Sequence, residues 1–339
     1  MPAVDEPLLA RRQLADSTQW DFVRDLYDTT MDGTTHHGIE VRPLPGRGLG
    51  IVATMPLARG ERVIAEAPLH RWVRAKGERS DFAKLEHSVD ALPPLLWAAF
   101  YSLADNAACH GKTARGIWNT NSFVTEDVLG GGGGRSSDGI HRAAVFCVAS
   151  RFNHACHPNA FASWSATEDG GRMTVHTVRD VACGEELTIS YVAGAESGTR
   201  ASRRALLKRK YHFECDCDAC RLHGKRLKES DARHARLVEI HEALATGEDD
   251  ASVVALVEEQ YALMLEEGVP LVLGKAGWIL AMVQLMQRGD KVAAAQWASV
   301  GAECTRVALG TDSSAYLHFA RLLGLDEEVG ATPCATRAT

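Results

Sequence analysis

Three cysteines near the middle of the chain lie within six residues of one another, at Cys215, Cys217 and Cys220. Thiolates at this spacing can surround one zinc ion, but a tetrahedral structural zinc site needs four protein ligands. The residues between them, Asp216 and Asp218, are not typical of a buried core, which disfavours the alternative that these are core cysteines. We expect one structural zinc ion whose fourth ligand comes from another segment. Spacing leaves five candidates open for that ligand: Cys156, Cys183, His154, His157 and His212.

Composition excludes several classes of protein. The formal net charge is −7, so no general attraction to phosphate backbones is available and we predict no direct binding to nucleic acid. A basic protein partner fits this charge better. No apolar run of about 18 residues predicts a membrane span, and the first twenty residues do not read as a secretory signal. Nine cysteines then indicate thiols and metal ligands in a reducing compartment, the nucleus or the cytoplasm.

Hydrophobic spacing predicts where helices and strands lie. Short β-prone runs from Ile39 to Leu69 predict small sheets, and similar runs recur at Met173–Val178 and Leu187–Tyr191. Between them a helical segment is expected, with its leucines, Leu95 among them, on one face together with Phe100. Beyond Lys225, apolar residues at helical spacing predict consecutive antiparallel helices. The turns between these helices are expected at Gly268, Gly289 and Gly310.

Two sequence blocks resemble the signatures of one family. Residues 151–160 (RFNHACHPNA) contain an Asn-His-x-Cys-x-Pro-Asn pattern, and residues 184–191 (GEELTISY) follow about thirty residues later. The first resembles the signature of SET-domain methyltransferases, and the second resembles the block that closes the same domain. Residues 46–50 (GRGLG) are similar to the opening strands of a SET domain, and residues 204–220 are similar to the post-SET segment of the branch that carries a MYND zinc finger and of fungal SET-domain proteins.

The resemblance spans about Ile39 to Cys220 and implies an α+β fold. It implies a SET-domain β-fold of small sheets with a pseudoknot, a zinc-bound post-SET segment and a C-terminal α-helical domain. Residues 70–120 contain a single cysteine, Cys109, so we expect the MYND module to be absent. The predicted domains in chain order are an N-terminal helical extension (1–35), the SET domain (36–194) with a helical insertion at about 78–116 and a flexible glycine-rich loop at 129–139, the post-SET zinc segment (195–224), a helical-hairpin domain (225–325) and a disordered tail (326–339).

The resemblance also implies a site. Family members hold S-adenosylmethionine (SAM) and keep the target lysine among aromatic side chains, and the post-SET zinc takes its fourth ligand from the Asn-His block. Carried over to this chain, the implied zinc ligands are Cys156, Cys215, Cys217 and Cys220. The implied cofactor-binding residues are Gly48, Leu49, Asn121, Asn153, His154, Tyr191, Tyr211 and Phe213. The implied catalytic residues are Tyr191, beside the reacting atoms, and Phe123, in the wall of the lysine channel.

These residues predict a SAM-dependent protein-lysine N-methyltransferase that acts on a lysine-containing protein such as a histone. We expect the chain to work as a monomer. A catalytically silent SET scaffold that binds other proteins is the alternative, and the intact set of implied site residues disfavours it. Methyl transfer to a small molecule or to another side chain is a third hypothesis.

Overall fold

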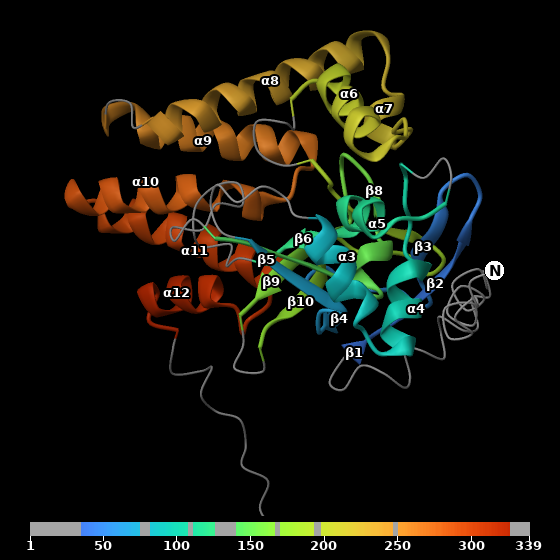
Figure 1. Ribbon diagram of the computed structural model, residues 1–339. Helices are drawn as coiled ribbons and strands as arrows, with labels where there is room; N and C mark the ends of the chain where they lie inside the picture. The colour runs from blue at the N-terminus through green and yellow to red at the C-terminus, as the bar shows by residue number, and fades with distance from the viewer. Residues whose placement is uncertain are drawn as a thin grey trace, which may run out of the picture.

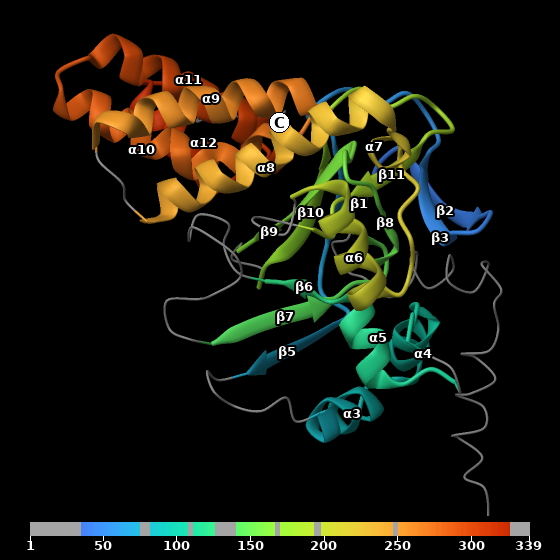
Figure 2. The same ribbon diagram turned by 90° about the horizontal axis from the view of Figure 1, so that it is seen from above.

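The structure, a computed structural model, describes residues 35–74, 82–107, 111–125, 140–166, 170–192, 198–246 and 250–325. Within them, small sheets lie beside a group of long C-terminal helices (Figures 1 and 2). The predicted N-terminal helix, the glycine-rich loop and the C-terminal tail lie outside the described residues.

Every strand is short, which agrees with the turn residues that interrupt the β-prone runs. The strands are β1 (Thr35–His36), β2 (Ile39–Leu44), β3 (Gly48–Ala53), β4 (Arg62–Glu66), β5 (His70–Arg74), β6 (Phe123–Val124), β7 (His141–Val145), β8 (Asn153–His154), β9 (Ala160–Ser165), β10 (Arg172–Thr177) and β11 (Glu186–Ile189). A short 3-10 helix, η1 (Ala149–Arg151), ends one residue before β8. The strands expected from the sequence are therefore confirmed.

The described strands form three sheets. Their orders are β1-β4-β10-β9, β2-β3-β11-β8 and β5-β7-β6. Almost all pairs are antiparallel, but β8 and β11 run parallel, with Asn153 opposite Thr188 and His154 opposite Ile189. Parallel strands cannot be joined by a tight turn. The second sheet thus brings together two blocks that are far apart along the chain.

A shared apolar core holds the first two sheets against each other. Its strands are buried along most of their length: β3 buries Gly50–Ala53 and β10 buries Met173–Thr177, as expected when both faces of a strand are covered. The members that lie below 2% exposure are Ile51, Ala53, Val63, Ile64, Val148, Phe152, Ala160, Val175 and Leu187. Leu49, Phe123 and Tyr191 pack on the edge of this cluster. Three of the predicted site residues are therefore positioned by the same core.

The insertion consists of three helices, α3 (Phe82–Asp90), α4 (Pro94–Ser102) and α5 (Ala114–Asn121). The expectation that Leu95 shares the buried face is wrong, because Leu95 is 46% exposed whereas Phe100 is fully buried. Both residues belong to α4, but five residues at 3.6 per turn place their side chains about 140° apart around the helix axis. The last helix runs to Asn121, beyond the predicted end near residue 116. Absence of the MYND module stays a prediction.

The C-terminal half is helical, as expected. After α6 (Arg200–Tyr211) and α7 (Asp218–Arg221) come α8 (Gly224–Thr246), α9 (Asp250–Glu267), η3 (Leu271–Gly274), α10 (Lys275–Gln287), α11 (Lys291–Leu309) and α12 (Ser314–Leu322). The turn glycines Gly268, Gly289 and Gly310 all have positive φ angles, of 67°, 78° and 88°. The short helix α7 was not expected from the sequence. None of the helices within the described ranges combines the length and hydropathy that crossing a membrane would require.

The helical region packs directly on the first sheet. The end of α11 buries Ala308 and Leu309 against Phe161 of β9 and Val178, which follows β10. Arg59 of the loop after β3 donates to Glu303 of α11 at 2.6 Å. Figure 1 shows α11 lying beside β9. The helices therefore cover one side of the small sheets and leave β2, β3 and β11 on the other.

Candidate functional site

The two signature blocks cross at the parallel pair β8 and β11. Ala155 N–H donates to the Ile189 carbonyl at 3.0 Å, which continues the pairing beyond β8. Asn159 secures the other side of the crossing: its Nδ2 donates to the Glu186 carbonyl at 2.9 Å, and its Oδ1 accepts from Thr188 N at 2.8 Å. Asn159 is buried, so these bonds are shielded from water and fix the relative position of the blocks.

Asn153 connects this crossing to the glycine-rich turn. Its Nδ2 donates to Glu186 Oε1 at 2.9 Å and to the Leu49 carbonyl at 3.3 Å. Three separate segments, β3, β8 and β11, therefore meet at one amide. One common surface therefore contains Asn153, Leu49 and the Glu186 carboxylate, although these residues are far apart in the sequence.

Two glycines shape the glycine-rich turn: Gly50 is closely surrounded by other atoms, whereas Gly48 is not. A Cβ at Gly50 would lie 2.3 Å from Leu44 Cδ1 and 2.8 Å from Asn153 Nδ2, so only glycine permits this contact. Gly48 has a φ of +69°, and a Cβ there would meet no atom within 4 Å. The backbone at Gly48 thus faces open space beside Asn153, which suits a turn that presents its carbonyls to a ligand.

Tyr191 lies next to this surface and is held at both ends. Its backbone N–H donates to His154 Nδ1 at 3.0 Å, and its hydroxyl donates to the Phe152 carbonyl at 2.5 Å. The ring centroids of Tyr191 and His154 are 5.3 Å apart. The phenol position is therefore set by the two residues on either side of Asn153.

Burial also sets the protonation state of Tyr191. Removal from water is the main cause that raises the pKa of the Tyr191 phenol above its ordinary value, and the neighbouring Tyr211 raises it further. Tyr191 therefore stays neutral at physiological pH. It can give and accept hydrogen bonds, but it is not a phenolate base.

The post-SET helix α6 delivers two further aromatic rings. Thr199 caps the start of α6 by accepting from Ser202 N, and the helix ends at His212, whose φ of 59° turns the chain sharply. This turn leaves Tyr211 with its ring centroid 4.9 Å from that of Tyr191. Phe213 comes next, with its centroid 6.1 Å from His154. The predicted residues His154, Tyr191, Tyr211 and Phe213 thus form one aromatic cluster.

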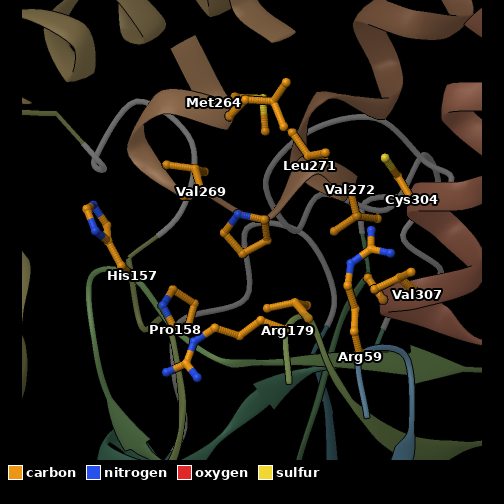
Figure 3. Close-up of a pocket in the computed structure, with 15 residues that line it drawn as sticks. Arg59, His157, Pro158, Arg179, Met264, Val269, Leu271, Val272, Cys304 and Val307 are labelled. Atoms are coloured by element: carbon orange, nitrogen blue, oxygen red, sulfur yellow. The ribbon is translucent and has the colours of Figure 1, made fainter. Parts of the chain in front are cut away.

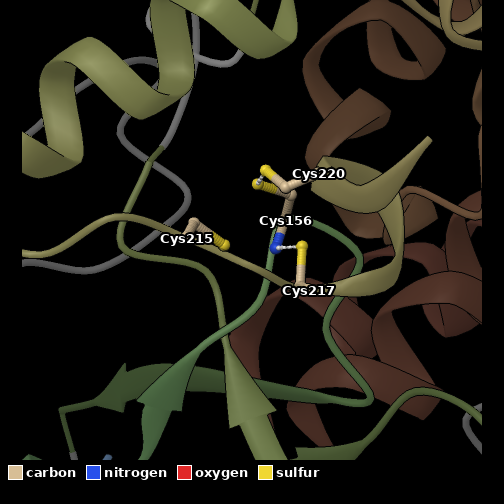
Figure 4. A group of neighbouring side chains, drawn as sticks. All are labelled: Cys156, Cys215, Cys217 and Cys220. Carbon is tan, nitrogen blue, oxygen red and sulfur yellow. Dashed lines mark hydrogen bonds between the residues drawn. The ribbon is translucent and has the colours of Figure 1, made fainter. Parts of the chain in front are cut away.

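The four predicted zinc ligands also come together (Figure 4). Cys156 follows β8, and the other three cysteines lie between α6 and the end of α7. All four Sγ atoms lie within 4.8 Å of one another, and Cys156 Sγ is 3.6 Å from Cys220 Sγ. The remaining candidates for a fourth ligand are not members of this group.

The donor set fits a tetrahedral zinc ion. Four sulfurs at about 2.3 Å from zinc lie about 3.8 Å from one another, close to the spacing found here. Cys156 N–H donates to Cys217 Sγ at 3.4 Å, a bond that favours a thiolate. A hydrogen bond from the Cys156 thiol lowers the pKa of Cys217 to about 5, and the same neighbour lowers the pKa of Cys215. Contacts within the cluster raise the pKa of Cys156 and Cys220, so two of the four sulfurs favour the thiolate form and two favour the thiol.

Two predicted residues stand apart from the crossing. Asn121 Nδ2 donates to the Ala104 and Ile117 carbonyls, both at 2.6 Å, so its amide N–H groups are used inside the helical insertion. Its own carbonyl accepts from Ser150, just before β8. Phe123 packs its ring 5.8 Å from Phe146. A direct cofactor contact by the Asn121 side chain, as the resemblance implies, stays a prediction.

Three residues that position the site were not singled out from the sequence. Arg47 Nη2 donates to the His154 carbonyl at 3.0 Å, and its Nε lies 3.2 Å from Glu186 Oε2. Asn159 is described above. Glu66 is fully buried, and its carboxylate accepts from Val148 N and Ala149 N at 2.9 and 2.8 Å, which holds the turn before β8. Their presence inside the quoted motifs was the available signal.

Glu66 should make stability depend on pH. Burial raises its pKa from 4.5 to about 7, against the opposing bonds from Ala149 and Val148. Between these values the unfolded chain ionises while the folded protein keeps its proton, so the free energy of unfolding falls as pH rises from 4.5 to 7. Glu66→Gln stays neutral at every pH, so its free energy of unfolding should lack this fall. By pH 7 the wild type should have lost about 3 kcal/mol more of its free energy of unfolding than the variant.

Urea unfolding at a series of pH values measures this effect. Glu40→Gln serves as the control, because Glu40 is an exposed carboxylate on β2. If the free energy of unfolding changed with pH in the same way for the wild type and Glu66→Gln between pH 4.5 and 7, the titration could not be assigned to Glu66.

Comparison with known proteins agrees with the geometry. A family model described as the SET domain matches residues 48–192. The histone-lysine N-methyltransferase set5 of Schizosaccharomyces pombe is 25% identical over 289 residues, 83% of this chain and 82% of that protein. The histone-lysine N-methyltransferase SET5 of Meyerozyma guilliermondii is 35% identical over 28% of this chain. The human histone-lysine N-methyltransferase SMYD3 is 40% identical over 22% of this chain.

The shorter matches cover 20% of the Meyerozyma protein and 16% of the human protein, so they concern this one region. The family match contains the glycine-rich turn, the crossing of β8 with β11, and Tyr191. The α+β fold of small sheets with a helical C-terminal region is the one that the resemblance implied. Residues 48–192 are therefore a SET domain.

Proposed function

We propose that this chain is a SAM-dependent methyltransferase that modifies the side-chain amine of a lysine in another protein. The observation that carries the proposal is the crossing of β8 and β11, at which Asn153 bonds to Leu49 of the glycine-rich turn and Tyr191 bonds to His154. The relatives named above as histone-lysine N-methyltransferases support the same activity.

The residues present fit the cofactor. A Cβ at Gly48 would meet no atom within 4 Å, and the Asn153 side chain donates to the carbonyl of the next residue, Leu49. The Phe213 ring lies 6.1 Å from the His154 ring, and the Tyr211 ring lies 4.9 Å from the Tyr191 ring. SAM, when bound, supplies an electrophilic methyl group on a sulfonium. We infer that Gly48 and Leu49 offer carbonyls, that Asn153 and His154 orient the amino-acid and adenine groups, and that Phe213 packs on the adenine.

The aromatic cluster would prepare the target amine. A lysine amine has a pKa near 10.4 and is not nucleophilic while it is protonated, but apolar surroundings favour its neutral form. Phe123 and Tyr191 pack against one buried cluster and would form walls of such a channel. The neutral Tyr191 hydroxyl would orient the amine by hydrogen bonding, so that alignment supplies most of the rate.

We assign the four-cysteine cluster to one structural zinc ion. Cys156 lies two residues after His154, and Cys215 lies two residues after Phe213. A zinc ion bound to all four sulfurs would therefore hold Phe213 and Tyr211 over the cofactor surface. With four protein ligands it would have no open position and would take no part in the chemistry.

A histone is the proposed substrate class, and the nucleus is the proposed place of action. Two facts support this: the relatives carry histone-lysine methyltransferase in their names, and the net charge of −7 suits a basic partner.

Binding and transfer are tested in sequence. Calorimetry with SAM on the zinc-loaded protein should show binding, whereas no detectable binding would favour the silent scaffold. Incubation of the protein with core histones and labelled SAM, followed by mass spectrometry, should then locate the methyl group on a lysine. A label on another side chain or on a small molecule only would reject lysine specificity.

A further inference from the structure

A second group of metal-ligating side chains lies where the SET domain meets the C-terminal helices. His157 belongs to the loop after β8, His234 lies on α8, and Glu267 ends α9. Their ligand atoms lie within 4.8 Å of one another. His157 Nε2 is 3.3 Å and His234 Nε2 is 3.4 Å from Glu267 Oε2. The three residues are far apart in the chain, so only the docking of the helices brings them together.

Apart from the Glu267 carboxylate, the Nε2 atoms of the two imidazoles have no polar partner among the described residues. Both Nε2 atoms are buried, and neither makes a hydrogen bond of acceptable geometry. His234 is 3% exposed and Glu267 is 4% exposed. Buried polar atoms without partners are rare and costly in folded proteins. Two such atoms directed at one carboxylate oxygen indicate a shared ligand.

The spacing of the three atoms is that of a coordination shell. An ion bound by nitrogen and oxygen at about 2.1 Å in tetrahedral geometry separates its ligands by about 3.4 Å. The observed separations of 3.3 and 3.4 Å match this value. Two histidines and one glutamate are also a common set of zinc ligands with a fourth position left for water.

Neighbouring side chains hold the Glu267 carboxylate so that its Oε2 atom faces the two imidazoles. Arg233 Nε donates to Glu267 Oε1 at 2.6 Å, and Ser230 Oγ donates to Oε2 at 2.9 Å. These two hydrogen bonds favour the ionised form of the Glu267 carboxylate. Glu266, 3.7 Å from Arg233, offsets the positive charge of that guanidinium. Glu267 is therefore an anionic ligand.

We propose that His157, His234 and Glu267 bind a second divalent transition-metal ion of the zinc class, separate from the four-cysteine site. Such an ion joins the loop that carries the Asn-His block to helices α8 and α9. Because His157 directly follows Cys156, the two ions hold neighbouring residues from opposite sides. The ion would fix the helical domain in position beside the SET domain.

The site also borders a cavity between the two parts of the protein. His157 lines a space of about 390 Å³ together with Pro158, Met264 and Val269. Figure 3 shows His157 and Pro158 at the sheet side of this space and Met264 and Val269 at the helix side. Loss of the ion should therefore loosen the walls of this cavity.

Metal analysis of the full-length protein, purified without a polyhistidine tag, tests the proposal. The wild type should contain about two zinc equivalents, and His234→Ala should retain about one. Glu267→Gln keeps the side-chain shape and should lose the same equivalent. His241→Ala is the matched control, because His241 is exposed on the same helix, and it should keep both.

Cobalt binding by the wild type gives a test that does not depend on a variant. Titration with Co²⁺ after metal removal should fill one site with thiolate charge-transfer absorption and a second site without it. One equivalent in the wild type, with no second uptake of Zn²⁺ or Co²⁺, would overturn the proposal. The assignment of methyltransferase activity would be unaffected by that result.

Discussion

Replacement of Tyr191 by phenylalanine is expected to lower kcat by about 100-fold while the affinity for SAM changes little. The ring of Tyr191 is buried among His154, Tyr211 and Phe213, and phenylalanine keeps that packing. What the variant loses is the hydroxyl, which is directed at the Phe152 carbonyl. The hydroxyl is the polar group proposed to orient the lysine amine, so its loss should affect turnover rather than cofactor binding.

The pH profile separates orientation from base catalysis. Burial raises the pKa of Tyr191, so its phenol does not ionise in the working range, and the rate should rise with pH as the free lysine loses its proton. The same rise is expected in Tyr191→Phe at a lower rate. Tyr261→Phe, on α9, is the control and should be fully active. Unaltered kcat in Tyr191→Phe would remove Tyr191 from the catalytic residues.

Replacement of Cys217 by serine is expected to remove about one bound zinc ion per chain and to unfold the post-SET segment. Zinc binding in structural sites of this kind contributes about 10 kcal/mol or more to folding, and loss of one thiolate removes much of it. The segment carries Tyr211 and Phe213, whose positions depend on the turn at His212 and on the cysteine cluster. SAM affinity should therefore fall at least tenfold.

Cys183→Ser is the matched control for this variant. Cys183 was a candidate ligand by residue type, but it is exposed and its thiol donates to the Thr54 carbonyl. Its replacement should leave zinc content and SAM affinity unchanged. Metal analysis measures the zinc content of both variants, and calorimetry measures their affinity for SAM. If Cys217→Ser bound as much zinc as the wild type, the assignment of the four-cysteine site would be contradicted.

Much of the site could be predicted because its chemistry lies in short continuous motifs. The two blocks at residues 151–160 and 184–191 contain Asn153, His154, Cys156 and Tyr191, so a local pattern carries most of the site. The turns between the C-terminal helices could also be predicted, since their glycines adopt positive φ angles that other residues avoid. The predicted turn at Gly310 joins α11 to α12, whereas the short helix α7 was missed.

Other features depend on contacts between segments that no local pattern relates. The pairing of the Asn121 amide with the Ala104 carbonyl follows from the packing of the insertion. The role of Glu66 depends on a turn more than 80 residues later in the chain.

The sequence by itself determined that this chain carries a SET domain and which residue types line its site, because short motifs at set spacings specify both. Only the tertiary structure decided that Cys156, rather than Cys183 or a histidine, completes the cysteine cluster. It alone brought His157, His234 and Glu267 together. The physical reason is that such sites form where separate elements dock, and docking depends on how their buried faces fit rather than on residues that are neighbours in the chain.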